Sequence, residues 1–106
     1  MTKDEVFVLA VEGRLDAVLA DRLQEDLVRL IKRGERAILL DFSKIQQISG
    51  PGLRVLLVAG KGSERIGCRF ALSGVNESVA RVLAASGFDR IITAHPDQCS
   101  ALDALV

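Results

Sequence analysis

The amino-acid sequence predicts a single α/β domain over residues 1–106, with a largely parallel sheet of about four to five strands and four helices. Three observations predict this fold class. A chain of 106 residues is long enough for one domain and too short for two. Hydrophobic residues make up 49% of it and only four residues are aromatic, so aliphatic side chains supply the core. Short apolar runs alternate with helical patterns along the chain, which implies right-handed crossovers between parallel strands.

The first strand and the first helix are predicted from hydrophobic patterning. The continuous apolar run Val6–Val11 is typical of a buried strand, and residues 12–14 are expected to turn the chain. Between residues 17 and 33, apolar residues recur at helical spacing, namely Leu19, Leu23, Leu27, Leu30 and Ile31. Asp16 is placed to cap this helix and Gly34 to end it.

The middle of the chain repeats the same order. Residues 37–40 predict a second buried strand, followed by an irregular or briefly extended connection over residues 42–48. Pro51 then opens a helix that runs to about residue 65, because proline suits the first helical position. Residues 68–72 alternate partly in polarity and predict a third strand.

The last third of the chain contains the remaining elements. A third helix is predicted from the spacing of Val75, Val79, Val82 and Leu83, and Gly87 is expected to end it. Residues 90–93 predict a short fourth strand. Pro96 begins a final helix with an inner face of Ala101, Leu102 and Leu105.

Composition narrows the classes of function. The 14 basic and 14 acidic side chains cancel, whereas nucleic-acid binders usually carry a basic excess, so we expect no nucleic-acid partner. No apolar stretch approaches the roughly 20 residues of a membrane span, and the polar N-terminus does not resemble a signal peptide. We therefore expect a cytoplasmic protein without direct membrane insertion, in which Cys68 and Cys99 are free thiols that serve as small packing residues.

The sequence offers little for catalysis or metal binding. His95, the only histidine, stands beside Pro96 at a strand-to-helix junction, where a surface or capping role is expected. A Ser-His-Asp arrangement requires His95 to meet a serine across the fold, and no pattern argues for that. Two isolated cysteines cannot close a zinc site. We expect no catalytic residue, no metal and no cofactor.

Two glycine-containing turns are candidate phosphate sites. Residues 49–52 precede a helix, whose N-terminus favours an anion. However, Pro51 removes one backbone donor and the lysine of a P-loop is missing. Residues 60–63 lie inside or just after a helix rather than after a strand. A nucleotide-binding protein or an enzyme is therefore the least favoured alternative.

Three segments resemble one family. Residues 48–57, Ile-Ser-Gly-Pro-Gly-Leu-Arg-Val-Leu-Leu, resemble the signature of the STAS domain, which in that family follows a strand ending in Asp-x-Ser, as residues 41–43 do here. Residues 11–17 resemble its Gly-x-Leu-Asp turn into the first helix, and residues 82–92 its late Leu-x-x-x-Gly-[Leu/Phe] segment. The three segments occur in the family's order and extend over essentially the whole chain.

The resemblance implies a regulator that binds another protein and is not an enzyme. The family includes the bacterial anti-sigma factor antagonists, which bind an anti-sigma factor and thereby free a sigma factor. That partner is also a serine protein kinase, which phosphorylates a Ser or Thr at the start of the signature helix. The phosphate adds about −1.5 to −2 charges to the docking patch and prevents binding.

The sequence departs from the family at the acceptor position. When Gly52 and Leu53 are aligned with the Gly-Leu of the signature, Gly50 takes the place of the acceptor, between Ser49 and Pro51. Glycine has no hydroxyl group, so either the phosphorylation switch is absent or it has moved to Ser49. A second interpretation, a STAS subunit of a membrane lipid-transport ATPase complex, needs no acceptor and fits Gly50 well.

The resemblance also implies the residues that bind the partner. They are Asp16, Ser49, Gly50, Pro51, Gly52 and Arg54. Asp16 has a second role as a helix cap, and Ser49 as a local hydrogen-bonding residue. The two glycines suit a tight passage from strand to helix, and Arg54 is a candidate contact because arginine is enriched at interfaces.

Overall fold

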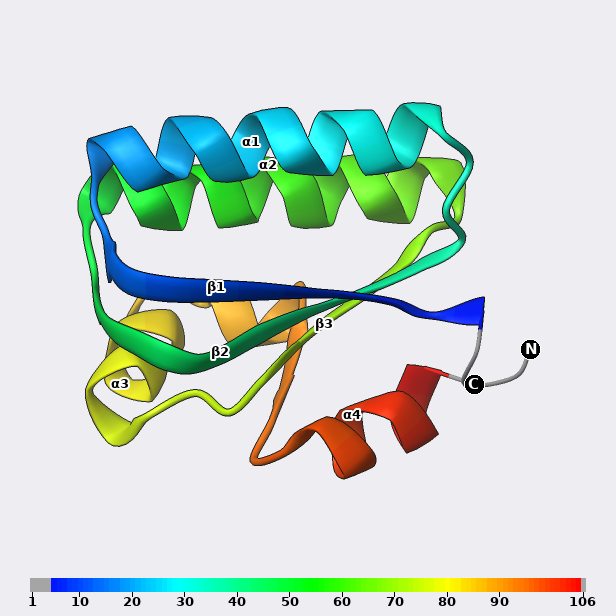
Figure 1. Cartoon of the computed structure of the whole chain (residues 1–106). Helices are drawn as coiled ribbons and strands as arrows, with labels where there is room; N and C mark the ends of the chain where they lie inside the picture. The colour runs from blue at the N-terminus through cyan, green and yellow to red at the C-terminus, as the bar shows by residue number, and fades with distance from the viewer. Residues whose placement is uncertain (1–4, 106) are drawn as a thin grey trace.

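The predicted α/β fold is confirmed by a computed structural model, which describes residues 5–105 apart from the side chain of residue 89 (Figure 1). Its four strands form one parallel sheet in the order β1-β2-β3-β4. The elements are β1 (Phe7–Leu15), α1 (Ala17–Lys32), β2 (Ala37–Ile48), α2 (Gly50–Ile66), β3 (Arg69–Ser73), α3 (Glu77–Ala85), the 3₁₀ turn η2 (Phe88–Arg90), β4 (Thr93–His95) and α4 (Gln98–Leu105).

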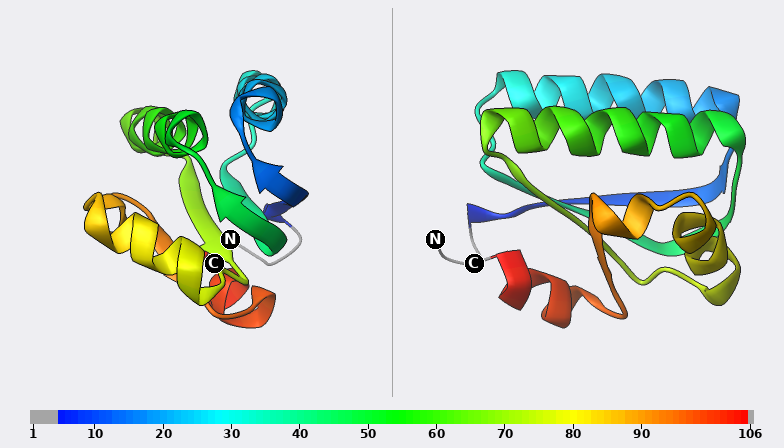
Figure 2. Two further views of the ribbon diagram at one scale, coloured as in Figure 1. Left: turned by 90° about the vertical axis from the view of Figure 1, so that its left-hand side faces the viewer. Right: turned by 180° about the vertical axis from the view of Figure 1, so that it is seen from behind.

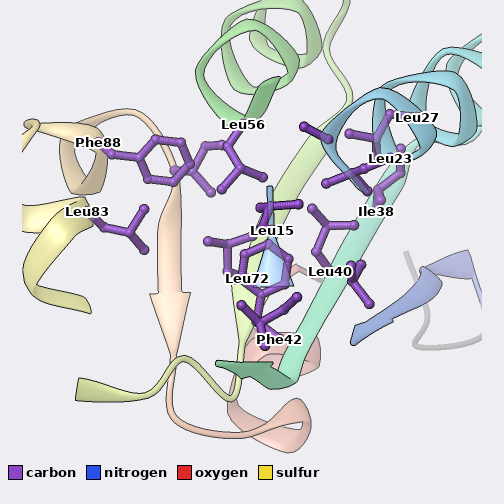
Figure 3. Packing of buried hydrophobic residues seen from close by; sticks show 14 of the residues in the cluster. Leu15, Leu23, Leu27, Ile38, Leu40, Phe42, Leu56, Leu72, Leu83 and Phe88 are labelled. Carbon is purple, nitrogen blue, oxygen red and sulfur yellow. The ribbon is translucent and has the colours of Figure 1, made fainter. Parts of the chain in front are cut away.

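Helices cover the two faces of the sheet unequally. The long helices α1 and α2 lie side by side over one face, while the short helix α4 lies against the other (Figure 2). The larger core forms under α1 and α2, and it includes Leu56 of α2 together with Leu40, Phe42 and Leu72 of the sheet (Figure 3). A smaller cluster under α4 consists of Val6, Ala37, Leu39, Ala71, Ala101 and Leu105.

Both of the first two strands run further than the sequence predicts. Residues 12–14 do not turn the chain, because β1 continues to Leu15 with Gly13 at a φ of 103° and register shifts on either side of residues 12 and 13. Of the two possibilities for residues 42–48, irregular or briefly extended, the extended one holds, and it goes further than expected because the segment continues β2 and pairs with the end of β1. The prediction relied on continuous apolar runs, and the register shifts lie at or beyond the ends of these runs. The expectation that the first strand is buried is also wrong, because β1 is an edge strand in which Val8 and Ala10 are exposed.

The fourth strand and the cysteines also differ from expectation. Phe88–Arg90 forms a 3₁₀ turn, so β4 is displaced to Thr93–His95 rather than residues 90–93. Cys68 is buried, as a packing residue should be, and burial raises the pKa of its thiol. Cys99 is exposed, so the expectation that it packs internally is wrong.

A candidate docking surface at the start of two helices

Helices α1 and α2 begin side by side because the strands that precede them are paired to their ends. Leu15, the last residue of β1, lies opposite Ile48, the last residue of β2. The Ser49 amide then donates a hydrogen bond of 2.9 Å to the Leu15 carbonyl oxygen. Asp16 caps α1 as predicted, since its carboxylate accepts a 3.0 Å bond from the Leu19 amide.

The Ser49 hydroxyl joins the two strand ends to the first turn of α2. It donates a 2.6 Å hydrogen bond to the Leu15 carbonyl oxygen and accepts a 3.2 Å bond from the Gly52 amide. Ser49 is thus the N-cap of α2, and the helix begins at Gly50, one residue earlier than predicted. Both hydrogen bonds serve to position the loop, which agrees with the local role expected for Ser49.

The two glycines of the signature differ in their surroundings. A Cβ atom at Gly52 would lie 2.6 Å from the Leu15 carbonyl oxygen and 2.7 Å from Leu15 Cγ, so the first turn of α2 packs too closely on β1 for a side chain. A Cβ atom at Gly50 would meet no atom within 4 Å, and Gly50 is exposed. Gly52 therefore supports the fold, while Gly50 presents bare backbone to solvent.

Four of the six predicted site residues are exposed together at this end of the molecule: Asp16, Gly50, Pro51 and Arg54, here called the docking surface. Ser49 is half-buried and Gly52 is buried beneath it. Arg54 forms no ion pair with any residue between 5 and 105. A shallow cavity of about 260 Å³ adjoins the surface, lined by Arg14, Leu15, Asp16, Gln47, Ile48 and Ser49.

Sequence patterns missed two residues beside this surface. Arg14 and Gln47 are exposed, lie opposite each other at the ends of β1 and β2, and line the same cavity. Arg14 falls in a predicted turn and Gln47 in a segment predicted to be irregular or briefly extended, so their pairing was hidden. Recognition that β1 and β2 extend to the helix starts would have revealed them.

The electrostatic character of the docking surface comes mainly from backbone. The N-termini of α1 and α2 both lie here, and each carries a partial positive charge from its unpaired amide groups. No acidic residue occupies the first turn of α2, and Arg54 adds a full positive charge. Asp16 supplies the only carboxylate among the four residues of the docking surface. This arrangement can bind a polar partner surface.

A second polar group lies under α4 and corrects one expectation. Asp41 is paired with Ser73 across β2 and β3, and Ser73 with His95 across β3 and β4, so His95 does lie beside a serine across the fold. We call these three residues the polar row. They are not joined as a catalytic relay: the fully buried Ser73 hydroxyl has no hydrogen-bond partner, and His95 Nε2 lies 3.2 Å from Thr93 Oγ1 instead.

Asp41 is held in place by its own contacts. Its carboxylate accepts 3.0 Å bonds from the Ser43 amide and from the Gln98 side chain of α4. Burial alone would raise the pKa of Asp41, but these hydrogen bonds and the nearby Lys44 ammonium outweigh it and hold the pKa below its ordinary value. The ionised carboxylate thus helps to fasten α4 to the sheet.

The described residues were expected to contain neither a metal site nor a membrane-spanning segment. Among residues 5–105, no group of three or more His, Cys, Asp or Glu side chains is arranged to hold a metal ion. Within the same residues, none of the helices is both long enough and apolar enough to cross a membrane.

Comparison with known proteins agrees with the resemblance. The model of the STAS domain family matches residues 1–101. A candidate anti-sigma factor antagonist of Bordetella bronchiseptica is 28% identical over 85 residues, which cover 80% of this chain and 73% of the relative.

Solved structures extend the likeness to the fold. The crystal structure of a candidate anti-sigma factor antagonist of Thermotoga maritima superposes with a TM-score of 0.91 at 25% identity, covering 99% of this chain and 91% of that one. A sulfate transporter family protein of Wolinella succinogenes superposes with a TM-score of 0.86, covering 99% of this chain and 88% of that one. Because only 21% of the residues are identical, this likeness shows the shared fold alone. With a family model that spans nearly all of its residues, this chain belongs to the STAS domain family.

Proposed function

We propose that this STAS domain is an anti-sigma factor antagonist that binds an anti-sigma factor through the docking surface. The observation that carries the proposal is the contrast within the signature loop. Ser49 and Gly52 are occupied in holding the loop against Leu15, whereas Gly50, Pro51 and Arg54 are exposed and face solvent. A rigid loop with exposed residues that make no contacts of their own is suited to binding a partner at little entropic cost.

The proposal favours binding over catalysis. Within the polar row, the Ser73 hydroxyl is sealed from solvent and the Asp41 carboxylate is occupied by Ser43 and Gln98. The docking surface itself combines one carboxylate, one guanidinium group and backbone amides. The candidate antagonists of Bordetella bronchiseptica and Thermotoga maritima support the same regulatory role.

We further propose that the partner does not switch this protein off by phosphorylation. Gly50 has no hydroxyl group, and phosphorylation of Ser49 would remove the hydroxyl hydrogen that forms the 2.6 Å bond to the Leu15 carbonyl oxygen. After incubation with the kinase and ATP, mass spectrometry should find residues 49 and 50 unmodified. Gly50→Ser should become a substrate at residue 50, because serine suits the start of a helix. Phosphate on wild-type Ser49 would contradict the proposal.

A subunit of a transport complex is the second candidate function, and Gly50 favours it, since such a domain needs no phosphoacceptor. The two candidates predict different partners. Co-purification should recover an anti-sigma factor if the leading proposal holds, and transporter subunits if the second one does. Addition of the protein to a purified complex of anti-sigma factor and sigma factor should then release the sigma factor.

Substitution of Arg54 tests the docking surface with that anti-sigma factor. Arg54→Glu should weaken binding by about tenfold, since a reversed charge at an interface opposes the partner's own charges. Its melting temperature should stay close to that of the wild type, because Arg54 is exposed. Arg22→Glu on α1 is the matched control, as Arg22 is also an exposed helical arginine without a partner among the described residues. Equal losses in both variants would contradict the assignment.

A further inference from the structure

The outward face of α2 continues the docking surface along the length of the helix. Arg54, Val58, Lys61 and Arg65 follow one another at offsets of four, seven and eleven residues, so they form one stripe on the helix. All four side chains are exposed, and Val58 is 60% exposed. At a rise of about 1.5 Å per residue, the stripe is about 16 Å long. We call these four residues the α2 stripe.

The three cations of the α2 stripe outnumber the carboxylates of their own helix and are not paired with them. Some basic side chains on other elements are paired, as in the ion pairs Arg29–Asp26 and Arg81–Glu77, whereas Arg22 of α1 has no partner among the described residues. Among residues 5–105, Arg54, Lys61 and Arg65 form no ion pair or side-chain hydrogen bond. Glu64 is the only acidic residue of α2, which leaves three positive charges against one in a chain whose net charge is zero.

This arrangement costs the isolated protein stability. Lys61 and Arg65 stand four residues apart, a spacing at which like charges destabilise a helix. Val58, an apolar side chain, is exposed between Arg54 and Lys61. A row of unpaired cations around an exposed apolar side chain gains stabilisation only when an oppositely charged surface covers it.

We propose that the α2 stripe binds an acidic segment of the partner protein, whose carboxylates meet Arg54, Lys61 and Arg65 and whose apolar side chain covers Val58. This inference rests on the proposed function, because it extends the docking surface and names the chemistry of the partner. An acidic protein segment fits better than a nucleic acid, because proteins that bind nucleic acids usually carry an excess of basic residues and this chain has a net charge of zero. A membrane surface would require a much wider apolar face than Val58 alone provides.

The first test uses the anti-sigma factor identified under the proposed function. The double variant Lys61→Glu/Arg65→Glu should bind it at least about tenfold more weakly, equivalent to about 1.4 kcal/mol, and with a weaker dependence on salt. Arg22→Glu should bind within about twofold of the wild type. If Gly50→Asp abolishes binding while the double variant binds normally, the proposed function stands and this inference is wrong. If both bind normally, both proposals fail.

The second test uses a defined probe. A helical peptide of about 18 residues, with Glu at every third or fourth position, is compared by NMR titration with the same peptide carrying Gln. The Glu peptide should shift the amide signals of residues 54–65, and neither the Gln peptide nor the double variant should give such shifts. The inference is overturned if the Glu peptide leaves these signals unchanged. It is also overturned if duplex DNA or phosphatidylglycerol vesicles bind more tightly than the Glu peptide at about 0.15 M salt and lose binding in the double variant.

Discussion

The docking surface lies at the carboxyl ends of β1 and β2, and the polar row crosses β2, β3 and β4, yet the two polar regions are built in opposite ways. At the docking surface, the buried polar atoms of Ser49 are satisfied by backbone groups, and Gly50, Pro51 and Arg54 remain exposed. In the polar row, Asp41 is used to fasten α4, and Ser73 is sealed beneath that helix with its hydroxyl unpaired.

The difference teaches that the kinds of residue present do not by themselves identify a functional site. The polar row contains the residue types of a hydrolase, but none of its three side chains bonds to another, and its serine is not accessible. The docking surface contains glycine and proline, which carry no chemistry, but its exposed groups are free to meet a partner. Accessibility and spare bonding capacity distinguish the two regions.

The largest effect on stability is expected from the close contact beneath the docking surface. Gly52→Ala places a Cβ atom 2.6 Å from the Leu15 carbonyl oxygen, a backbone atom that cannot move aside easily. We expect a loss of about 1–3 kcal/mol in the free energy of unfolding. Gly50→Ala, two residues away in open space, should stay within about 0.5 kcal/mol of the wild type. Urea denaturation compares the two, and equal losses would mean that the glycines are not distinct.

Two serine substitutions compare how much a serine hydroxyl contributes to stability in each region. Ser49→Ala removes a helix cap and the bond to the Leu15 carbonyl oxygen, and should cost about 1–2 kcal/mol. Ser73→Ala removes a buried hydroxyl that has no partner, and should be neutral or stabilising. Thermal unfolding of both variants measures this difference. A greater loss at Ser73 than at Ser49 would reverse the comparison.

A smaller effect is expected from pH at the polar row. The pKa of Asp41 is lowered in the folded state, so its ionised form stabilises the fold above the ordinary value of 3.8, and this contribution disappears as pH falls through the folded value. Asp41→Asn should lower stability by about 0.5–1 kcal/mol at neutral pH. The difference in stability between wild type and Asp41→Asn should disappear as the pH falls below about 3.8. Asp21→Asn, at an exposed position of α1, is the control, and an identical pH profile for both variants would refute this role.

Much of the fold could be predicted because local patterns determine it. The spacing of Leu19, Leu23, Leu27 and Leu30 specifies the buried face of α1, and all four are buried or half-buried as expected. The end of β2 could not be predicted, because Phe42 and Ile45 are buried with two polar residues between them. Register shifts in the pairing with β1 produce that spacing, and they depend on a strand far away in sequence.

The sequence indicated which residues form the site, but it did not show which of them are buried and which are exposed. The signature indicated Ser49, Gly50 and Gly52, yet no local pattern shows which of them is buried. That distinction depends on Leu15, which is 34 residues from Ser49 along the chain and reaches it only through strand pairing. The same pairing across the sheet brings His95 beside Ser73, which sequence spacing could not reveal.

The most direct test of the central claim is the affinity of Gly50→Asp for the anti-sigma factor. The substitution puts a carboxylate where a Cβ meets nothing, at a helix N-terminus that favours negative charge, so the fold should remain intact. Ser100→Asp is the control, because it adds the same charge in the first turn of α4, on the opposite face of the sheet. An unpaired charge buried at an interface costs several kcal/mol, and about 2.8 kcal/mol corresponds to a hundredfold loss. The account predicts at least that loss for Gly50→Asp and wild-type affinity for Ser100→Asp. Wild-type affinity in a folded Gly50→Asp variant would contradict it.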